Sequence, residues 1–186
     1  MKLRIFLFFY ILFITSASSI GNSVKDQQQM IDSYYAYVKC HDVTELYINE
    51  TYRFLDDIGF MESSNNHRAV NRFGYMGTYQ FSMTLLRNLG YEGTAYTFLD
   101  NPLIQDYMMM KLLRHNSRVL VRQIEAYDGT MIDSRIITKS GILASAHLIG
   151  PYRTRLYLEY GLDFSDANGT RASYYLFRFS GYHIKI

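Results

Sequence analysis

Apolar side chains recur at helical spacing along most of this chain. One stripe after Thr44, a candidate helix cap, advances in steps of three and four residues through Ile48, Tyr52, Leu55, Ile58 and Met61. This spacing is typical of one buried face of an α-helix. Six further segments carry a similar period or helix-boundary signals: 24–39, about 80–90, 101–127, 138–149, 153–160 and 170–179. The pattern therefore predicts a mainly α protein.

Residues with special backbone or capping properties mark the predicted helix ends. Asn101 followed by Pro102 is a strong start signal, and Gly150-Pro151 is a stop signal. Thr138 and Ser140 are candidate caps, and Thr170 is another. Residues 64–78 have no helical period and contain two glycines, so a loop or a small β-lobe is predicted there.

The first nineteen residues have the layout of a secretory signal peptide. Lys2 and Arg4 precede an apolar run at 5–14, and small residues follow at 15–19. The run is shorter than the roughly 20 apolar residues of a membrane span. We expect export to a periplasm or beyond the cell, with residues 20–186 forming one domain and no stable membrane span after cleavage. An uncleaved anchor is the alternative.

Charge and cysteine content exclude several functions. Without Lys2 and Arg4 the chain keeps 17 basic residues against 17 acidic ones. Nucleic-acid binding needs a basic excess, so no such partner is predicted. Cys40 is the single cysteine, and the five histidines lack zinc-ligand spacing. We therefore expect no metal and no cofactor.

Glu62 is the candidate catalytic residue. It continues the Ile48–Tyr52–Leu55 series, and fourteen residues at about 100° each bring it to within roughly 40° of that apolar face. A carboxylate is unexpected there, and burial would raise its pKa and suit it to proton donation. The next acid is Glu92. The alternative is a helix-end acid paired with Arg68 or Arg72.

The residues around Glu62 would suit a neutral, polar ligand such as a sugar. Ser63 and Gln80 supply hydroxyl and amide groups, and Tyr75, Tyr79 and Phe81 supply rings that can stack on sugars. With 18 Tyr and 12 Phe in the chain, most aromatic residues must instead belong to the core.

Two motifs resemble lytic transglycosylases of the lysozyme-like superfamily. Glu62-Ser63, a loop, and then Gly77-Thr-Tyr-Gln80-Phe81 resemble the family's Glu-Ser…Gly-Leu-Met-Gln signature. Ser145-Ala-His-Leu-Ile-Gly150-Pro151 is similar to its Ala-Tyr-Asn-Ala-Gly motif. The resemblance spans about residues 45–180. It implies a lysozyme-like α domain with a small loop/β lobe beside an active-site cleft.

The resemblance also implies roles for individual residues. Glu62 would be the catalytic acid/base, Ser63 would support it or bind substrate, and Gln80 would hydrogen-bond the sugar or the acid. His147 and Leu148 stand where the family motif has Tyr and Asn. His147 would then donate to Glu62 or to substrate, although a lone histidine on an apolar helix is more often a core residue.

The family's substrate would be the glycan strands of peptidoglycan. A hydrolytic glycosidase ordinarily needs a second carboxylate, and residues 63–91 offer none. Lytic transglycosylation uses one carboxylate and closes a 1,6-anhydro ring with the muramyl sugar's own C6 hydroxyl. A muramidase assisted by Asp128, Asp163 or Asp166 is one alternative. A non-catalytic glycan-binding or secretion-apparatus protein is another, and a helical interaction protein is a third.

Overall fold

The computed structural model describes residues 29, 32 and 45–186 of the chain. The predicted signal peptide, Cys40, the cap at Thr44 and nearly all of the predicted helix at 24–39 lie outside the described residues. Within 45–186 the protein is mainly helical, which confirms the predicted class. No helix in this part of the chain has both the length and the apolarity that a membrane crossing requires.

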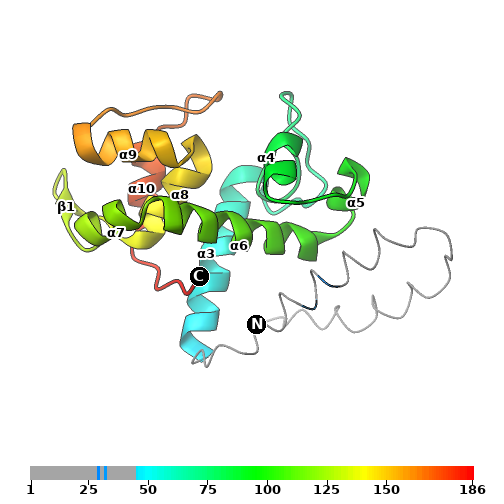
Figure 1. Ribbon diagram of the computed structural model, residues 1–186, viewed down its shortest axis with the longest axis horizontal. Coiled ribbons are helices and arrows are strands. Elements are labelled where there is room, and N and C mark those ends of the chain that lie inside the picture. Colours follow the sequence, from blue (N-terminus) through cyan, green and yellow to red (C-terminus); the bar gives the residue numbers. More distant parts are fainter. Residues whose placement is uncertain (1–28, 30–31, 33–44) are drawn as a thin grey trace, which may run out of the picture.

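Helices of unequal length and one small hairpin follow one another along the chain. Their bounds are α3 (Glu45–Ser63), α4 (Met83–Asn88), α5 (Ala95–Leu99), α6 (Pro102–Val119), α7 (Val121–Tyr127), β1 (Met131–Ile132), β2 (Arg135–Ile136), α8 (Lys139–Ile149), α9 (Pro151–Tyr160) and α10 (Ala172–Arg178). In Figure 1, α6 crosses in front of α3, with α4 and α5 on one side and α7 to α10 on the other.

Helix α8 lies at the centre of the helical body. Residues 140–146 are all buried, and α8 packs against α6, α9 and α10. Gly141 brings α8 and α10 close together, because a Cβ atom there would lie 2.2 Å from the carbonyl oxygen of Leu176. The main core, which includes Phe54, Met108 and Leu143, joins α3, α6 and α8.

Side chains cap the starts of α4 and α6, of which the sequence predicted the cap at Asn101. The Asn101 side chain accepts hydrogen bonds from the backbone N–H groups of Leu103 and Ile104, at 3.1 and 3.2 Å. Ser82, two residues beyond the predicted start at Gln80, caps α4 through the Leu85 N–H. Such caps satisfy N–H groups that have no partner within the helix.

The structure differs from the sequence prediction at several points. The predicted helix over 101–127 breaks at Leu120 into α6 and α7. The last helix begins after Arg171, and Thr170 donates its N–H to Asp166 in the preceding turn. A short antiparallel hairpin pairs 131–132 with 135–136, which the apolar pattern did not indicate.

The loop predicted at 64–78 is present, and it extends through Phe81 with limited β pairing. Single bridges join Val70 to Met76 and Met76 to Phe81. Gln105 of α6 is fully buried and holds this loop from the side. Its amide nitrogen donates to the carbonyls of His67 and Phe98, both at 2.9 Å, and its oxygen accepts the Thr78 N–H at 2.7 Å. The loop is thereby fixed to the helical body.

Candidate active site

Glu62 lies in the last turn of α3, with 15% of its side chain exposed. It shares a helix face with the buried residues Leu55 and Ile58, as its position in the apolar stripe predicted. A carboxylate near a helix C-terminus faces the negative end of the helix dipole, and the last turn of α3 holds no basic residue. The placement is unfavourable within α3 itself, so the stabilising groups must come from elsewhere.

Two other helices supply those groups. Tyr175 of α10 donates its hydroxyl hydrogen bond to Glu62 Oε1 at 2.8 Å. His147 of α8 places Nε2 at 3.5 Å from the same oxygen, and its side chain is 5% exposed. The close crossing of α8 and α10 at Gly141 brings both residues to one carboxylate. The structure therefore joins Glu62 and His147, which the sequence singled out, with Tyr175, which it did not.

These partners reverse the predicted direction of the Glu62 pKa. Burial raises the pKa of this carboxyl, and it is the largest single influence. The N–H donor and the positive charge of His147, together with the Tyr175 hydroxyl, act in the opposite direction and outweigh it. The pKa of Glu62 therefore lies below its usual value, and the predicted rise is wrong.

Tyr175 is fixed as a hydrogen-bond donor. Burial of its ring and the adjacent negative charge of Glu62 raise the pKa of the phenol far above its ordinary value. The hydrogen bond to Glu62 and the charge of Asp166 act in the same direction. The hydroxyl therefore keeps its proton well above neutral pH, and it directs that proton at the carboxylate.

His147 has an incomplete set of partners. Its Nδ1 atom is buried and has no hydrogen-bond partner. The ring meets Phe81 edge-on, with centroids 6.0 Å apart. An imidazolium carries a proton on both nitrogens, so the one on Nδ1 would be unsatisfied. The positive form of His147 is supported by Glu62 on one side alone.

The alternative pairing of Glu62 with an arginine is not what the structure contains. Arg68 forms an ion pair with Asp100, and the Arg72 guanidinium lies 4.6 Å from the ring centroid of Phe73. Both arginines are therefore engaged at the loop surface.

Ser63 and Gln80 shape the loop next to Glu62. The Ser63 hydroxyl donates to the Thr78 carbonyl at 2.9 Å, and the Gln80 amide donates to the Gly77 carbonyl at 2.9 Å. Gln80 adopts a left-handed backbone conformation with φ 50°, which is uncommon for a residue with a side chain. The Ser63 side chain thus ties the loop to α3, whereas the Gln80 side chain closes a turn within the loop.

The aromatic candidates divide into buried and exposed rings. Tyr79 and Phe81 are 3% and 1% exposed, and the Tyr79 hydroxyl donates to Asp106 at 2.6 Å. They belong to the core, so the expectation that they stack on sugar rings is corrected to a supporting role. Tyr75 is 40% exposed and remains available. Tyr174, which the sequence did not single out, is half exposed, and its ring centroid lies 6.3 Å from that of Tyr175.

Each of the three aspartates that could assist a muramidase accepts a hydrogen bond from a backbone N–H group. Asp128 accepts from Lys139 at the start of α8, and Asp163 accepts from Ser173 in the first turn of α10. Asp166 closes the turn before α10. Of these, Asp166 is the one whose charge acts on Tyr175. Within the described part of the chain, no group of three or more His, Cys, Asp or Glu side chains could hold a metal ion.

Comparison with known proteins gave no match to a family model, to a curated protein or to a solved structure. The site is therefore interpreted from its own geometry.

The sequence did not indicate two of the residues that build this site. Tyr175 is one tyrosine among 18 and lies 113 residues from its partner. Gln105 is a polar residue among the apolar positions of α6, at which a buried amide signals an obligatory set of hydrogen bonds. That second signal is visible in the sequence, although its partners are not.

Proposed function

We propose that this protein is an exported peptidoglycan lytic transglycosylase with a lysozyme-like fold and with Glu62 as its single acid/base. The observation that carries the proposal is the half-buried Glu62 carboxylate, held by His147 and Tyr175 at the junction of the helical body with the loop 64–81. The resemblance of the Glu62-Ser63 and Gly77–Phe81 segments to that family supports the same assignment.

Because the pKa of Glu62 is lowered, the proton that Glu62 donates in catalysis must come from its neighbour His147. An ionised Glu62 with a protonated His147 has the same total charge as a neutral pair. A glycan strand that covers the site removes water, and loss of water disfavours the charge-separated form of the pair. The unsatisfied Nδ1 atom of His147 favours the same shift. The proton then resides on Glu62 when substrate is bound.

The reaction follows from this proton balance. Glu62 donates its proton to the glycosidic oxygen as the bond from that oxygen to C1 of the muramyl sugar breaks. The resulting carboxylate accepts the proton of the C6 hydroxyl, whose oxygen bonds to C1 and closes the 1,6-anhydro ring. No water is consumed, and Glu62 is again protonated at the end of the cycle. Tyr175 and His147 stabilise the carboxylate stage.

The decisive experiment is a digest of purified peptidoglycan, with the products identified by mass spectrometry. We expect anhydromuramyl products from the wild type and none from Glu62→Gln. Glu92→Gln, at an exposed position after the loop, is the matched control and should retain activity. An absence of products from the folded wild type would refute the enzymatic assignment.

One observation favours a hydrolytic muramidase as the second candidate. The charge of Asp166 acts on Tyr175, so this residue is the distal carboxylate with an electrostatic link to the site. Asp166→Asn keeps an oxygen that can accept the Asn168 and Thr170 N–H bonds, and it removes the charge together with the 3.4 Å hydrogen bond from the Asn168 side chain. Reducing-end products that disappear in Asp166→Asn would establish hydrolysis. Anhydro products that persist in this variant would exclude a role for Asp166.

A non-catalytic glycan-binding protein is the third candidate, and the low pKa of Glu62 favours it. An ionised carboxylate accepts hydrogen bonds from sugar hydroxyls without transferring a proton. Glycan binding without turnover, unchanged in Glu62→Gln, would support this function.

A further inference from the structure

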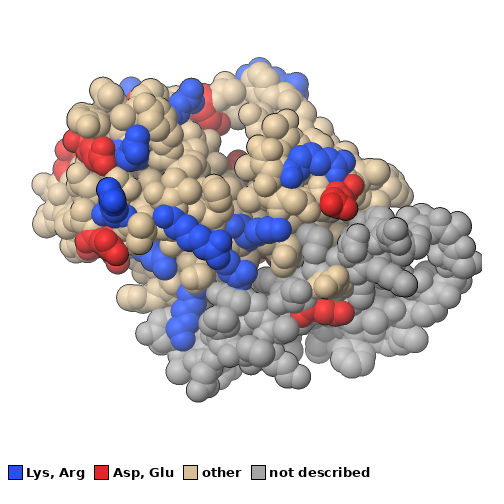
Figure 2. Space-filling model, viewed as in Figure 1, with Lys and Arg blue, Asp and Glu red and all other residues tan. Residues whose placement is uncertain are grey.

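A row of basic side chains follows α6 into α7. Lys111, Arg114 and Arg118 are spaced by three and four residues, which places them on one side of α6, and Arg122 follows in α7, just beyond the break at Leu120. No acidic residue occurs from 107 to 124. Figure 2 shows basic side chains gathered across the middle of this face of the molecule, over α6. We call these four residues the α6–α7 basic row.

Three arginines in this region have no acidic partner among the described residues. Arg118 and Arg122 are exposed, and within the described residues neither has an acidic partner. Arg155 of α9 contacts the Tyr152 ring, 5.2 Å from its centroid, and likewise has no acidic partner in the described part of the chain. By contrast, Arg53 and Arg68 elsewhere on the surface are paired with acids. The region therefore carries a local positive field although the predicted mature chain is neutral.

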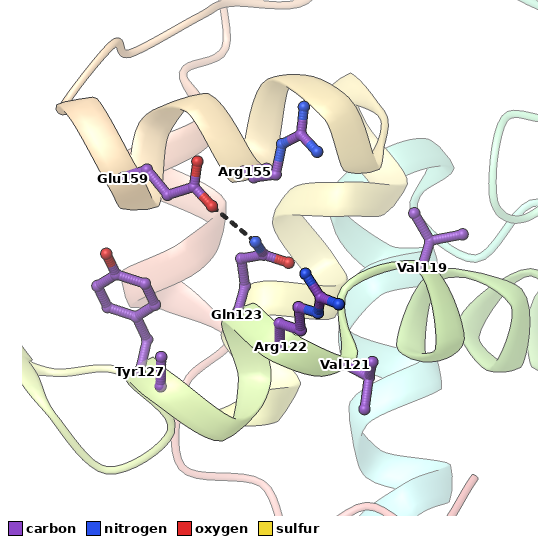
Figure 3. Close-up of a pocket in the computed structure, with 8 residues that line it drawn as sticks. Val119, Val121, Arg122, Gln123, Tyr127, Arg155 and Glu159 are labelled. Carbon is purple, nitrogen blue, oxygen red and sulfur yellow. Dashed lines mark hydrogen bonds between the residues drawn. The ribbon is translucent and has the colours of Figure 1, made fainter.

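A polar groove of about 580 Å³ lies between α7 and α9, next to the basic row. The Gln123 amide donates to Glu159 across it at 2.7 Å. In Figure 3, Arg122 and Arg155 lie on the side of this hydrogen bond that faces away from Tyr127. The groove contains none of the residues assigned to the candidate active site, so it is a separate feature of the surface.

Two apolar side chains border the same groove. Val119 and Val121 are 52% and 48% exposed, and they flank the break between α6 and α7. Arg118 precedes them and Arg122 follows them in the sequence. Exposed aliphatic residues set between arginines occur on helices that lie in the headgroup region of a membrane, where the apolar groups enter the acyl boundary. A soluble polyanion bound to the arginines would leave both valines exposed to water.

We propose that the α6–α7 basic row, with Val119 and Val121, docks the protein on an anionic phospholipid surface, and that Arg122 and Arg155 bind one headgroup phosphate in the groove. The planar guanidinium donates two parallel hydrogen bonds to phosphate oxygens, so two of them can clamp a single group. Each basic residue near an anionic membrane surface strengthens binding by about fivefold. This inference is independent of the proposed enzymatic activity.

The test is cosedimentation with vesicles of phosphatidylcholine, with or without phosphatidylglycerol. Because residues 1–19 are the same in every variant, the measured quantity is the ratio of binding between the two vesicles, compared between each variant and the wild type. We expect a ratio well above one that falls with added salt, since exposed charges are screened. Arg118→Gln combined with Arg122→Gln should lower the ratio about 25-fold or more. Arg53→Gln, an exposed arginine on α3, is the control and should leave it unchanged.

A second pair of variants tests the apolar contribution. Val119→Ser combined with Val121→Ser should weaken binding to the anionic vesicles and leave its salt dependence intact. Circular dichroism confirms that each variant is folded. Equal binding to both vesicles, or a ratio unaffected by the arginine changes, would overturn the proposal. So would binding of glycerol phosphate or of duplex DNA that is as tight as binding of anionic vesicles, because the site would then recognise a free phosphate or a nucleic acid.

Discussion

The Tyr175 hydroxyl and the Glu62 carboxylate meet at 2.8 Å and connect the last helix of the protein to the end of α3. The phenol is a permanent donor, because burial and the neighbouring negative charge raise its pKa. The carboxylate depends on that donor, since α3 itself offers its unfavourable dipole end. This hydrogen bond thus links α10 to α3 and also lowers the pKa of Glu62, the candidate acid.

Tyr175→Phe removes this donor and leaves the ring in place. We expect the free energy of unfolding at neutral pH to fall by about 1–3 kcal/mol, because a buried charged acceptor loses a hydrogen bond. The pKa of Glu62 should rise. Urea denaturation and a ¹³C NMR titration of the glutamate carboxyls measure the two effects. Tyr174→Phe, at the exposed neighbouring position, is the control and should change neither quantity.

His147→Gln keeps a polar side chain and removes the positive charge. Burial is then opposed by the Tyr175 hydroxyl alone, so the pKa of Glu62 should rise relative to the wild type. If Glu62 is the general acid, the fall of activity at high pH should move to higher pH. The pH profile of peptidoglycan cleavage measures this shift. His183→Gln, at an exposed position, is the control and should leave the profile unchanged. If the profile of His147→Gln is unchanged as well, His147 takes no part in the protonation of Glu62.

The low pKa of Glu62 also predicts how stability depends on pH. A carboxyl whose pKa is lower in the folded state stabilises that state at pH values above the unfolded value, near 4.5. This contribution is lost as the pH falls through the lower, folded-state pKa. We therefore expect the stability of wild type to fall more steeply than that of Glu62→Gln below pH 4.5. Thermal unfolding of both proteins from about pH 7 to about pH 3 measures the difference, and parallel curves would contradict it.

Gln105→Leu tests the connection between loop 64–81 and α6. The substitution leaves the Thr78 N–H and the carbonyls of His67 and Phe98 without their side-chain partner. Since each unsatisfied buried polar group costs about 1–3 kcal/mol, a loss of at least about 3 kcal/mol is expected. Denaturant unfolding measures it. Gln123→Leu, at a surface hydrogen bond to Glu159, should stay within about 0.5 kcal/mol of the wild type.

Gly77 and Gly74 form a matched pair in the same loop, because both have φ 79°. A Cβ atom at Gly77 would lie 2.6 Å from Gln105 Oε1, whereas nothing lies within 4 Å at Gly74. Gly74→Ala should therefore cost the backbone strain alone, about 1–2 kcal/mol. Gly77→Ala should cost clearly more, because it also displaces the Gln105 amide. Equal losses of stability in the two variants would show that the Gln105 side chain can move aside at little energetic cost.

Local signals were sufficient to predict many elements of the fold. Asn101 and Pro102 start α6, and Gly150 ends α8 before Pro151 starts α9. The break at Leu120 could not be predicted, because neither a glycine nor a proline marks it. The hairpin was missed for a similar reason. Its turn residues Asp133 and Ser134 adopt positive φ values, 49° and 61°, without the glycine that usually signals such a turn.

Helix periodicity predicted the burial of Glu62 but not its pKa. Burial is a property of one helix face, and that face can be read from the spacing of apolar residues. The direction of the pKa shift depends on His147 and Tyr175, which approach from α8 and α10. Tyr79 and Phe81 show the same limit, because their composition suits sugar stacking while their packing against Phe98 and Asp106 decides their role.

The contact of α8 with α10 at Gly141 also makes the site depend on a residue outside it. A Cβ atom at position 141 would lie 2.2 Å from the Leu176 carbonyl oxygen, so any larger residue must push the two helices apart. His147 of α8 and Tyr175 of α10 meet at the same oxygen of Glu62, and they would separate with their helices. The arrangement of both groups around Glu62 therefore requires that residue 141 has no side chain.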